Sequence, residues 1–361
     1  MIRVTHVINE LEIGGAETQL IHVLRRIDRT RFEPSVAYLF GEGTLAPLLK
    51  PLNVPAERIG LTRWNGPVAL ARLVSILKRW KPDIVHAHLV HATILGLWAS
   101  RLAGAPRRIV TRHFGVEVAG DAAYRLEPRL LKSASAVIAV SEAVGRCVVE
   151  KGWVRPGRVV TVPNGLDLEW FDGAALREQG GWPERSGGEI RIGAMANWRW
   201  QKGTDVLLDA FARVRRFRPS AALWMAGKRP ADARDGDGVR WWGAIPHERA
   251  AAFMSMVDLF VQPSRIEPFG ITVLEAMAAS RPVVATAVEG LKEIVVPEET
   301  GLLVAPDSAA ELADALLRLI DDVALRERLG RAGRERVARA FSIQRTVDGI
   351  QRVYEDVAPG R

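Results

Sequence analysis

Two glutamates, Glu267 and Glu275, lie eight positions apart in the segment EPFGITVLE. Pro268 and Gly270 disfavour a helix at Glu267, whereas ITVLEAMAA has the pattern of a helix start. The pattern therefore places Glu267 in a loop after the strand DLFVQPS and Glu275 about one turn into the following helix. Ligands of open α/β folds bind at this edge of the sheet, where a carboxylate can accept hydrogen bonds from ligand hydroxyl groups. Each such bond to a charged acceptor is worth roughly 1.5–3 kcal/mol.

The same segment offers backbone groups to an anion. The first N–H groups of a helix have no partner within the helix and bind phosphate readily. Here they belong to Phe269, Gly270, Ile271 and Thr272. Because carboxylates repel phosphate, we assign the two glutamates to hydroxyl groups, one on a hexose and one on the ribose of a nucleotide sugar. The alternative is a solvated loop glutamate beside a surface helix glutamate.

A second motif, MANWRWQKGTDVLLDAF, follows the strand EIRIGAMA with a short basic loop. Thr204 and Asp205 are reasonable caps for the next helix, which leaves Arg199 and Lys202 in the loop. Cations placed there stabilise the charge that grows on a diphosphate leaving group during bond cleavage. The alternative is a pair of solvated loop cations.

The first half of the chain contributes two weaker signals. Gly14 and Gly15 stand between a strand and a helix, where missing side chains allow the backbone to approach a ligand. The segment is not GxGxxG, so dinucleotide binding is poorly supported. His113 follows the strand RRIVTR, at a position that we expect to face a cleft between domains; the alternative is a hydrogen-bonded structural histidine.

Two patterns resemble metal sites. His86 and His88 alternate at a strand end, but no third ligand stands nearby at metal-site spacing. Asp235-Gly236-Asp237 forms a DxD sequence, but it lies in a Gly/Asp-rich stretch typical of a surface turn. We therefore predict no metal at either pattern.

Short apolar runs alternate with amphipathic stretches along the whole chain, which indicates right-handed crossovers and parallel sheets. We expect an α/β protein with two Rossmann-like domains facing across a cleft. The first domain is predicted over 1–171, a linker rich in glycine and charge over 172–189, and the second domain over 190–345. A final helix over 346–361 need not pack on the second domain and can pack on the first.

Composition limits the classes of molecule that the protein is expected to bind. The 361 residues carry a formal net charge of +8, which favours polyanionic partners such as nucleic acid, anionic lipid or a phosphorylated substrate. The 11 tryptophans are scattered rather than interleaved with the basic runs, so we do not expect nucleic-acid binding. The single cysteine, together with no apolar leader or spanning segment, predicts a cytoplasmic protein.

One basic amphipathic helix, VALARLVSILKRW, leaves two alternatives open. With Arg72, Lys78 and Arg79 off its apolar face, it could lie on anionic lipid at the inner face of a membrane. In a Rossmann-like domain, however, such a helix usually packs its apolar stripe on the sheet.

With these residues assembled, the chain resembles the family-4 retaining glycosyltransferases of GT-B fold over nearly its whole length. EPFGITVLEAMAASRPVVAT resembles the family's E-x7-E motif, and VEGLKEIVVPEETGLLV its usual continuation. VIAVSEAV and VPNGLDLEWF resemble the end of the first domain, and GGAE at 14–17 the N-terminal glycine loop. These motifs are specific when found together and in this order.

The resemblance implies roles for the second domain. Glu267 would bind the hydroxyls of the donor hexose, helped by the amides of Phe269 and Gly270, and Glu275 would bind the ribose. Lys202, together with Arg199, would bind the diphosphate.

In the first domain, which would bind the acceptor, Gly15 would approach the diphosphate and His113 matches the family's active-site histidine. The implied reaction moves a hexose from a UDP- or GDP-linked sugar to a glycan or lipid-linked acceptor, with retention of configuration and without a metal or other cofactor. We expect its setting to be the assembly of a bacterial surface polysaccharide or lipopolysaccharide.

Two departures from the family pattern affect the site. Asn197 stands where many members have an arginine, and Arg199 suits the position used by others. Glu289-Gly290 replaces a common Gly-Gly, which bears on the loop shape near the donor, although Glu293 remains. The alternatives are a non-catalytic GT-B sugar-nucleotide binding protein and a related GT-B epimerase; the former would be expected to lose the cations or the paired glutamates.

Overall fold

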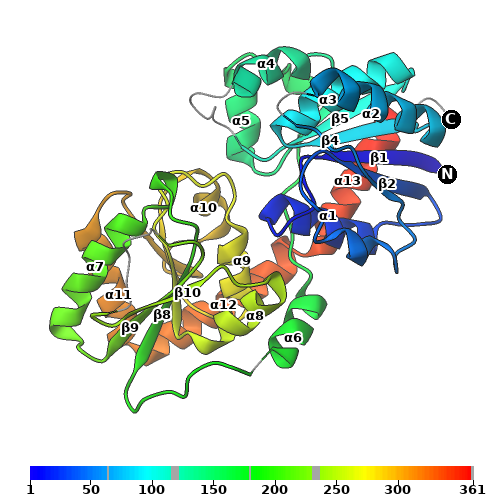
Figure 1. The fold of residues 1–361 in the computed structure, drawn as a ribbon. Helices are drawn as coiled ribbons and strands as arrows, with labels where there is room; N and C mark the ends of the chain where they lie inside the picture. Colours follow the sequence, from blue (N-terminus) through cyan, green and yellow to red (C-terminus); the bar gives the residue numbers. More distant parts are fainter. Residues whose placement is uncertain (63–64, 115–121, 179, 230–235, 359–361) are drawn as a thin grey trace. The chain divides into compact units, whose positions relative to one another are not determined.

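The computed structural model describes residues 1–62, 65–114, 122–178, 180–229 and 236–358. The chain forms two compact units (Figure 1). Unit 1 consists of Met1–Asn164 and Ile343–Arg361, and unit 2 of Gly165–Ser342. Each unit is a parallel sheet with crossover helices, so the predicted class of two Rossmann-like α/β domains is confirmed.

The described part of unit 1 contains a seven-stranded parallel sheet in the order β3-β2-β1-β4-β5-β6-β7. Its strands are β1 (Ile2–Ile8), β2 (Phe32–Tyr38), β3 (Ala56–Arg58), β4 (Ile84–His88), β5 (Arg107–Arg112), β6 (Ala136–Ala139) and β7 (Val159–Thr161). Its helices are α1 (Gly15–Arg26), α2 (Gly66–Trp80), α3 (Val90–Ala103), α4 (Ala122–Leu131), α5 (Glu142–Glu150) and α13 (Ile343–Val357), with the 3-10 turns η1 (Ala46–Leu49) and η2 (Pro156–Arg158).

The described part of unit 2 contains a six-stranded parallel sheet in the order β10-β9-β8-β11-β12-β13. Its strands are β8 (Ile190–Met195), β9 (Ala221–Ala226), β10 (Val239–Gly243), β11 (Leu259–Gln262), β12 (Val283–Thr286) and β13 (Gly301–Val304). Its helices are α6 (Leu168–Arg177), α7 (Thr204–Phe217), α8 (His247–Met256), α9 (Ile271–Ala278), α10 (Glu289–Ile294), α11 (Ala309–Asp321) and α12 (Val323–Ala340), with the 3-10 turn η3 (Trp200–Lys202).

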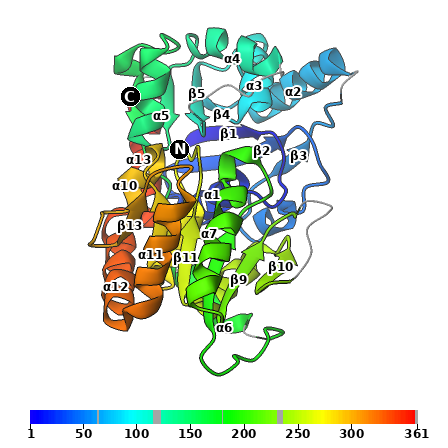
Figure 2. The same ribbon diagram turned by 90° about the vertical axis from the view of Figure 1, so that its left-hand side faces the viewer.

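Both sheets reverse their strand order once. In unit 1 the order turns between β1 and β4, and in unit 2 between β8 and β11. Helices therefore cover both faces; Figure 2 shows α7 and α11 side by side over one face of the unit-2 sheet. At such a reversal the connections leave in opposite directions and open a crevice at the carboxyl ends of the two central strands. Each unit thus has one predetermined place for a ligand.

Residues 165–189 differ from the expected domain end and linker. Residues 168–177 form α6, because the carboxylate of Asp167 accepts a hydrogen bond from the Trp170 N–H at 3.2 Å and caps the helix. Phe171 is buried, and α6 packs against α8 and α9 within unit 2. The high content of glycine and charge therefore predicted a linker wrongly, because the first part of 172–189 is helical and packs within unit 2.

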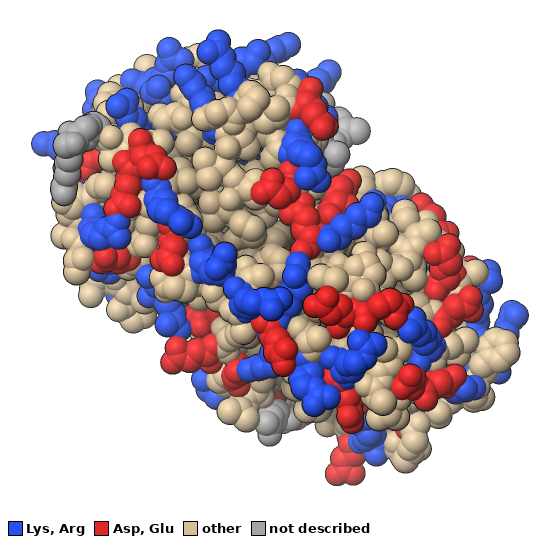
Figure 3. Space-filling model, turned by 180° about the vertical axis from the view of Figure 1, so that it is seen from behind, with Lys and Arg blue, Asp and Glu red and all other residues tan. Residues whose placement is uncertain are grey.

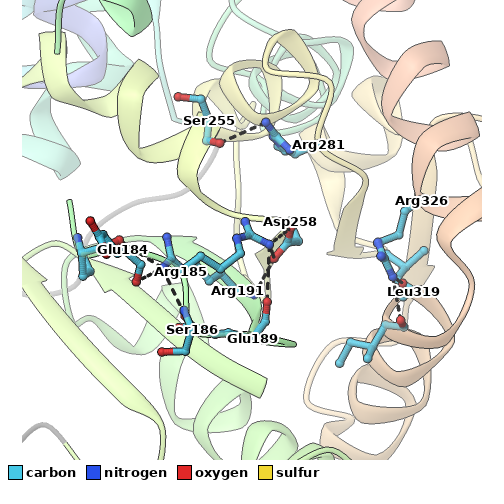
Figure 4. Close-up of polar contacts among 12 residues, drawn as sticks. Glu184, Arg185, Ser186, Glu189, Arg191, Ser255, Asp258, Arg281, Leu319 and Arg326 are labelled. Carbon is cyan, nitrogen blue, oxygen red and sulfur yellow. Dashed lines mark hydrogen bonds and ion pairs between the residues drawn. The ribbon is translucent and has the colours of Figure 1, made fainter. Parts of the chain in front are cut away.

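The following segment is also tied to unit 2 (Figure 4). Arg185 donates to the carboxylate of Asp258 at 2.8 Å, and the buried guanidinium of Arg191 donates to the carbonyl of Glu184 at 2.9 Å. The Arg191 guanidinium also lies 4.3 Å from the ring centre of Trp224. These contacts hold residues 184–189 at the amino end of β8.

The last helix belongs to unit 1. Ile343, Val347 and Ile350 of α13 share an apolar core with Val4 and Ile109 of the sheet, among other residues. Tyr354 is fully buried, and its hydroxyl shares a hydrogen bond of 2.7 Å with Nδ1 of His86. Burial raises the pKa of the Tyr354 hydroxyl well above its ordinary value, so the group stays neutral.

The Tyr354 hydroxyl generates a stability prediction. Tyr354→Phe should lower the free energy of unfolding by about 1–3 kcal/mol, because it leaves Nδ1 of His86 buried without that partner. Urea unfolding, followed by the signal of unit 1, measures the loss. Tyr38→Phe is the matched control, because the Tyr38 hydroxyl makes no side-chain hydrogen bond with described residues. Equal effects of the two substitutions would contradict the role given to this bond.

Candidate active site

In unit 2 the reversal of strand order brings together the loop after β8 and the loop after β11. Lys202, at the end of η3, follows β8, and Glu267 follows β11. Nζ of Lys202 lies 2.7 Å from Oε2 of Glu267. The lysine side chain is 31% exposed and the glutamate side chain 9% exposed, so the pair is open to a ligand mainly on the lysine side.

The Glu267 carboxylate is held in one orientation. Besides Lys202, its Oε2 accepts hydrogen bonds from Nε2 of Gln262 at 3.2 Å and from the Ser264 hydroxyl at 3.1 Å. Gln262 in turn accepts a hydrogen bond from the Thr272 hydroxyl at 3.0 Å. Oε1 of Glu267 accepts no side-chain hydrogen bond from the residues that the structure describes. One oxygen is thus fixed by the protein, and the other is left to accept from a ligand hydroxyl.

Arg265 joins the two loops. It donates to both oxygens of the Asp205 carboxylate, at 2.8 and 2.7 Å, and to the carbonyl of Trp200 at 2.8 Å. The bidentate bond to Asp205, followed by one to Asp307, raises the pKa of the Arg265 guanidinium above its ordinary value. Because Trp200 and Asp205 flank Lys202 in the chain, this arginine fixes the position of the lysine loop.

Two glycines permit the loops to approach each other. Gly203 has φ +61°, and a Cβ atom there would lie 2.0 Å from the carbonyl oxygen of Pro263. A Cβ atom on Gly290 would lie 2.4 Å from the carbonyl oxygen of Pro268. Any larger residue would therefore push the loop of Glu267 away from its neighbours on either side.

Glu289 and Gly290, which depart from the family pattern, both contact the loop that carries Glu267. The carboxylate of Glu289 accepts a hydrogen bond from the Glu267 N–H at 3.3 Å, and the Gly290 N–H donates to the Glu267 carbonyl at 3.1 Å. Asn197, the other departure, accepts from the backbone of Lys228 at 2.9 Å and so braces the turn after β8.

The start of α9 completes the unit-2 site. Its N-cap is Gly270, with φ +112°. The N–H groups of Phe269, Gly270, Ile271 and Thr272 donate no hydrogen bond to any acceptor in the described ranges. Phe269 itself is buried against the ring of Phe341, with ring centres 6.0 Å apart. The helix start therefore has unpaired N–H donors, which is the feature that favours an anion at such a position.

Glu275 lies deeper than Glu267. Its side chain is in the second half of α9 and only 3% of the residue is exposed. Burial raises the pKa of the Glu275 carboxyl to about 8, so it holds a proton at neutral pH. Arg199, in contrast, is exposed and makes no side-chain hydrogen bond or ion pair with described residues. It is free to follow a bound anion.

In unit 1 the predicted residues also lie at the carboxyl edge of the sheet. Gly15 begins α1, the helix that follows β1 after a six-residue loop, and His113 follows β5. Burial, followed by repulsion from Arg112, lowers the pKa of His113 to about 4, so its imidazole is neutral. Its Nε2 is buried and has no hydrogen-bond partner among the described residues. A ligand group could supply that partner.

A carboxyl group that the sequence analysis did not single out lies beside Gly15. Glu17 is 6% exposed, and burial raises its pKa to about 7, followed by repulsion from Glu10 and Glu12. Its Oε2 would lie 2.3 Å from a Cβ atom on Gly14, so the glycine makes room for it. Its presence in GGAE was visible in the sequence, but its burial was not.

The histidines of β4 gain a third member from β1. His6 pairs with His86 in register on the neighbouring strand, and ring nitrogens of His6, His86 and His88 lie within 4.8 Å of one another. The sequence expectation of no third ligand was therefore wrong, because it considered only nearby positions in the chain.

These three rings are engaged in hydrogen bonds. His86 uses both ring nitrogens, with the Tyr354 and Thr111 hydroxyls at 2.7 Å each, and Nδ1 of His6 shares a bond of 3.1 Å with Nε2 of His88. A metal ion would have to break this network. In the described part of the chain, no carboxylate or thiolate joins the cluster to offset the charge of an ion. The other metal-like pattern includes Asp235, which lies outside the described residues.

The predicted residues thus form two groups. In unit 2 Lys202 and Glu267 meet at the carboxyl edge between β8 and β11, Arg199 and the start of α9 belong to the same two loops, and Glu275 is buried further along α9. In unit 1 Gly15 and His113 lie at the carboxyl edge of that sheet. Sequence reasoning missed the residues that hold Glu267 and Lys202 in place, although three of them stand close to the motif: Gln262, Ser264 and Arg265.

Comparisons with known proteins agree with this arrangement. The model of the family described as "Glycosyltransferase Family 4" matches residues 13–170, and that of "Glycosyl transferases group 1" matches residues 181–336. A phosphatidyl-myo-inositol mannosyltransferase of Mycobacterium tuberculosis is 28% identical over 370 residues, covering 98% of this chain and 93% of that protein. A glycogen synthase of the same organism is 27% identical over 307 residues, covering 77% of this chain and 69% of that protein.

Solved structures share the fold. Anabaena Alr3699/HepE in complex with UDP-glucose superposes with a TM-score of 0.84 at 22% identity, covering 99% of this chain and 100% of that one. The lipopolysaccharide outer core galactosyltransferase WaaB superposes with a TM-score of 0.72 at 16% identity, covering 99% and 100%. These likenesses identify the GT-B fold, and the family models match nearly all of both halves. The chain belongs to the family-4 glycosyltransferases.

The neutral histidines generate a prediction for acid stability. Burial lowers the pKa of His6 to about 3 and those of His86 and His88 well below the ordinary value of 6.5. The unfolded chain therefore binds more protons below pH 6.5 than the folded chain does. The stabilising contribution of these three neutral histidines is complete above pH 6.5 and should fall as the pH drops, by about 1.4 kcal/mol per pH unit for each histidine.

Urea titrations of unit-1 unfolding between pH 8 and pH 5 measure this loss. His6→Gln should have a lower free energy of unfolding at pH 8. Its free energy of unfolding should also depend less steeply on pH, by about 1.4 kcal/mol per pH unit, because one fewer proton is taken up on unfolding. A pH dependence that is unchanged by this substitution would show that His6 is protonated in the folded protein.

Proposed function

We propose that the protein transfers a hexose from a UDP- or GDP-linked sugar to a glycan or lipid-linked acceptor, with retention of configuration and without a metal. The observation that carries the proposal is the unit-2 site. A lysine and a fixed carboxylate lie 2.7 Å apart, beside a helix start whose N–H groups are free of acceptors in the described ranges. Cation, amides and carboxylate match the diphosphate and the hydroxyl groups of one nucleotide sugar.

Each group receives a role from its surroundings. Lys202, Arg199 and the amides at the start of α9 bind the diphosphate and stabilise the charge that develops on it as the glycosidic bond breaks. These cations supply the charge that a divalent metal would otherwise provide. Oε1 of Glu267 accepts from a hexose hydroxyl, and Glu275 accepts from the ribose.

In unit 1 we assign His113 and Gly15 to the same donor. The neutral His113 ring offers its unpartnered Nε2 to a sugar hydroxyl, and Gly15 brings the start of α1 to the phosphate.

The relatives support the substrate classes. HepE was solved with UDP and with UDP-glucose, and the mycobacterial relatives at 28% identity are named for mannosyl transfer to a phosphatidyl-myo-inositol. A nucleotide-sugar donor and a lipid-linked acceptor are therefore precedented in this family. We propose the assembly of a bacterial surface glycan, such as lipopolysaccharide, as the setting.

Calorimetric titration with UDP, GDP and ADP, each with and without EDTA, tests the donor and the metal together. We expect micromolar binding of UDP or GDP that EDTA does not change. Affinity should also rise as the pH approaches 8, by up to about tenfold per unit, because ribose hydroxyls favour the charged Glu275 and binding releases its proton. No binding of any of the three nucleotides would favour the non-catalytic alternative.

Two matched variants separate the glutamates. Glu275→Gln should weaken nucleotide binding and remove its pH dependence, because the amide does not titrate. Glu267→Gln should not weaken nucleotide binding, because it releases Lys202 from its ion pair, but it should lower turnover by about 10²-fold, because the carboxylate that accepts from the transferred sugar is lost. Equal losses of nucleotide affinity in both variants would contradict this division.

We also propose that unit 1 contacts an anionic membrane surface on the cytoplasmic side. None of the helices in the described ranges is long and apolar enough to span a membrane. The apolar stripe of α2 is not available either, because Leu73 and Leu77 share a buried core with Val7 and Val85 of the sheet and with Leu39, which follows β2.

The surface proposed instead is the outer face of α3 and α4, which pack against each other. Trp98 and Leu102 of α3 are 47% and 57% exposed, and Arg101 lies between them on the same helix face. Leu126 of α4 is 40% exposed beside Arg125. Lysine and arginine also gather along the upper edge of unit 1 in Figure 3. Exposed apolar groups flanked by cations are typical of a surface that enters the lipid headgroup region.

Co-sedimentation with vesicles tests this surface. Binding to vesicles rich in anionic lipid should fall with salt, and Trp98→Ala/Leu102→Ser should weaken it at least about tenfold through lost apolar burial. Leu176→Ser/Phe217→Ala is the control, because it removes apolar groups of unit 2 that are even more exposed than Trp98 and Leu102. A similar loss in both double variants would overturn the assignment.

A further inference from the structure

Three arginines converge at the amino edge of the unit-1 sheet, the end opposite to Gly15 and His113. Arg107 and Arg108 begin β5, and Arg158 immediately precedes β7. They line a polar hollow of about 490 Å³ together with Ser133, Ser135 and Asp356, among others. We call these six residues the arginine hollow. Parallel strands begin at the same edge, which explains how positions about 50 residues apart come together.

Each guanidinium is anchored to the backbone by one side. Nε of Arg107 donates to the carbonyl of Val357 at 2.7 Å, and Nε of Arg108 to the carbonyl of Ser133 at 3.3 Å. NH1 of Arg158 donates to the carbonyls of Lys132 and Ala134 at 3.2 and 3.1 Å. The side chains are therefore held in place while their remaining N–H groups stay available.

The three guanidinium groups form no ion pair within the described residues, although Asp356 lines the same hollow. Other arginines of the chain behave differently: Arg265, Arg318 and Arg334 each bind a carboxylate through short contacts. Three cations against one carboxylate give the hollow a formal charge of +2. Burial, followed by repulsion from Arg101 and Arg107, lowers the pKa of Arg108. The cluster is thus an unfavourable arrangement until an anion offsets it.

The hollow also contains a neutral donor. The Ser135 hydroxyl oxygen accepts from the Arg108 N–H at 3.3 Å, and its own hydrogen has no acceptor among the described side chains and carbonyls. Arginine forks match the paired oxygens of phosphate, and a serine hydroxyl adds a further donor. A phosphate group with two negative charges matches the hollow in both charge and hydrogen bonding.

The hollow is separate from the sugar-transfer residues of unit 1. Arg107 and Arg112 stand at opposite ends of β5, about 17 Å apart at the usual rise per residue. His113 follows Arg112, so one strand carries both regions at its two ends. An anion in the hollow cannot touch a ligand bound at His113.

We propose that the arginine hollow is a second binding site, for a phosphate-bearing ligand with at least two negative charges. The ligand is either a soluble phosphate or pyrophosphate compound or the headgroup of a phosphorylated lipid. This site does not depend on the proposed donor or acceptor.

Pyrophosphate is the probe, and its binding is measured by calorimetry at low ionic strength. The background is Arg199→Gln/Lys202→Gln, which removes the diphosphate-binding cations of unit 2. In this background Arg108→Gln/Arg158→Gln should weaken pyrophosphate binding at least tenfold. Asp356→Asn should strengthen it several-fold, because one repulsive charge is removed without touching an arginine anchor.

Arg146→Gln/Arg345→Gln is the control, since both arginines are exposed in unit 1, outside the hollow, and the variant loses the same charge. An unchanged affinity in Arg108→Gln/Arg158→Gln, an equal loss in the control, or no effect of Asp356→Asn would overturn the proposal. Because the donor cations are absent from every protein compared, failure here leaves the proposed function untouched.

Vesicles distinguish the two sources of phosphate. If vesicles containing phosphatidic acid bind and Arg108→Gln/Arg158→Gln releases them, the ligand is a lipid headgroup. If these vesicles bind no better than neutral phosphatidylcholine while pyrophosphate binding depends on the hollow, the ligand is soluble. Both results support a phosphate site in the arginine hollow, and they differ only in whether its ligand is a lipid or a soluble compound.

Discussion

The reversal of strand order between β8 and β11 is the constraint on which the unit-2 site depends. Parallel strands direct all their carboxyl ends to one edge, and only at a reversal do two neighbouring loops lean apart and leave room for a ligand. Lys202 and Glu267, which are 65 residues apart, meet there because each follows one of the two central strands. The 2.7 Å contact between them is therefore a consequence of topology, and the local sequence supplies only the chemistry.

Holding these groups in place requires buried polar contacts, which are unfavourable unless fully paired. The carboxylate of Glu267 is paired with three donors on one oxygen, and Arg265 ties the lysine loop to the glutamate loop through Asp205. Gly203 and Gly290 lower the steric cost by letting the backbones touch. The site is thus organised before any ligand arrives, and charged groups that are fixed in advance stabilise developing charge without the cost of reorganisation.

Sequence alone was sufficient for features that depend on local pattern. Pro268 and Gly270 correctly place Glu267 in a loop and Glu275 in a helix, and strand–helix alternation correctly gives two parallel α/β units. The sequence-based prediction failed where interacting residues come from strands that are distant in the chain. His6 joins His86 only through strand pairing, and the burial that raises the pKa values of Glu17 and Glu275 depends on packing that no short segment encodes. Composition also misled: residues 168–177 look like the end of a domain and a linker, yet a cap at Asp167 and the buried Phe171 make them a helix of unit 2.

The ion pair of Lys202 with Glu267 bears directly on the proposed transfer, in which Lys202 binds the diphosphate of the donor. In the free protein the lysine charge is already satisfied by a carboxylate, so a ground-state diphosphate gains less from it than from an unpaired cation. As charge accumulates on the departing diphosphate, its attraction for the lysine grows, while that of Glu267 stays constant. The lysine can then shift toward the leaving group, and Gln262 and Ser264 still hold the carboxylate in place. Binding energy that appears mainly as the bond breaks raises the rate rather than the affinity for the donor.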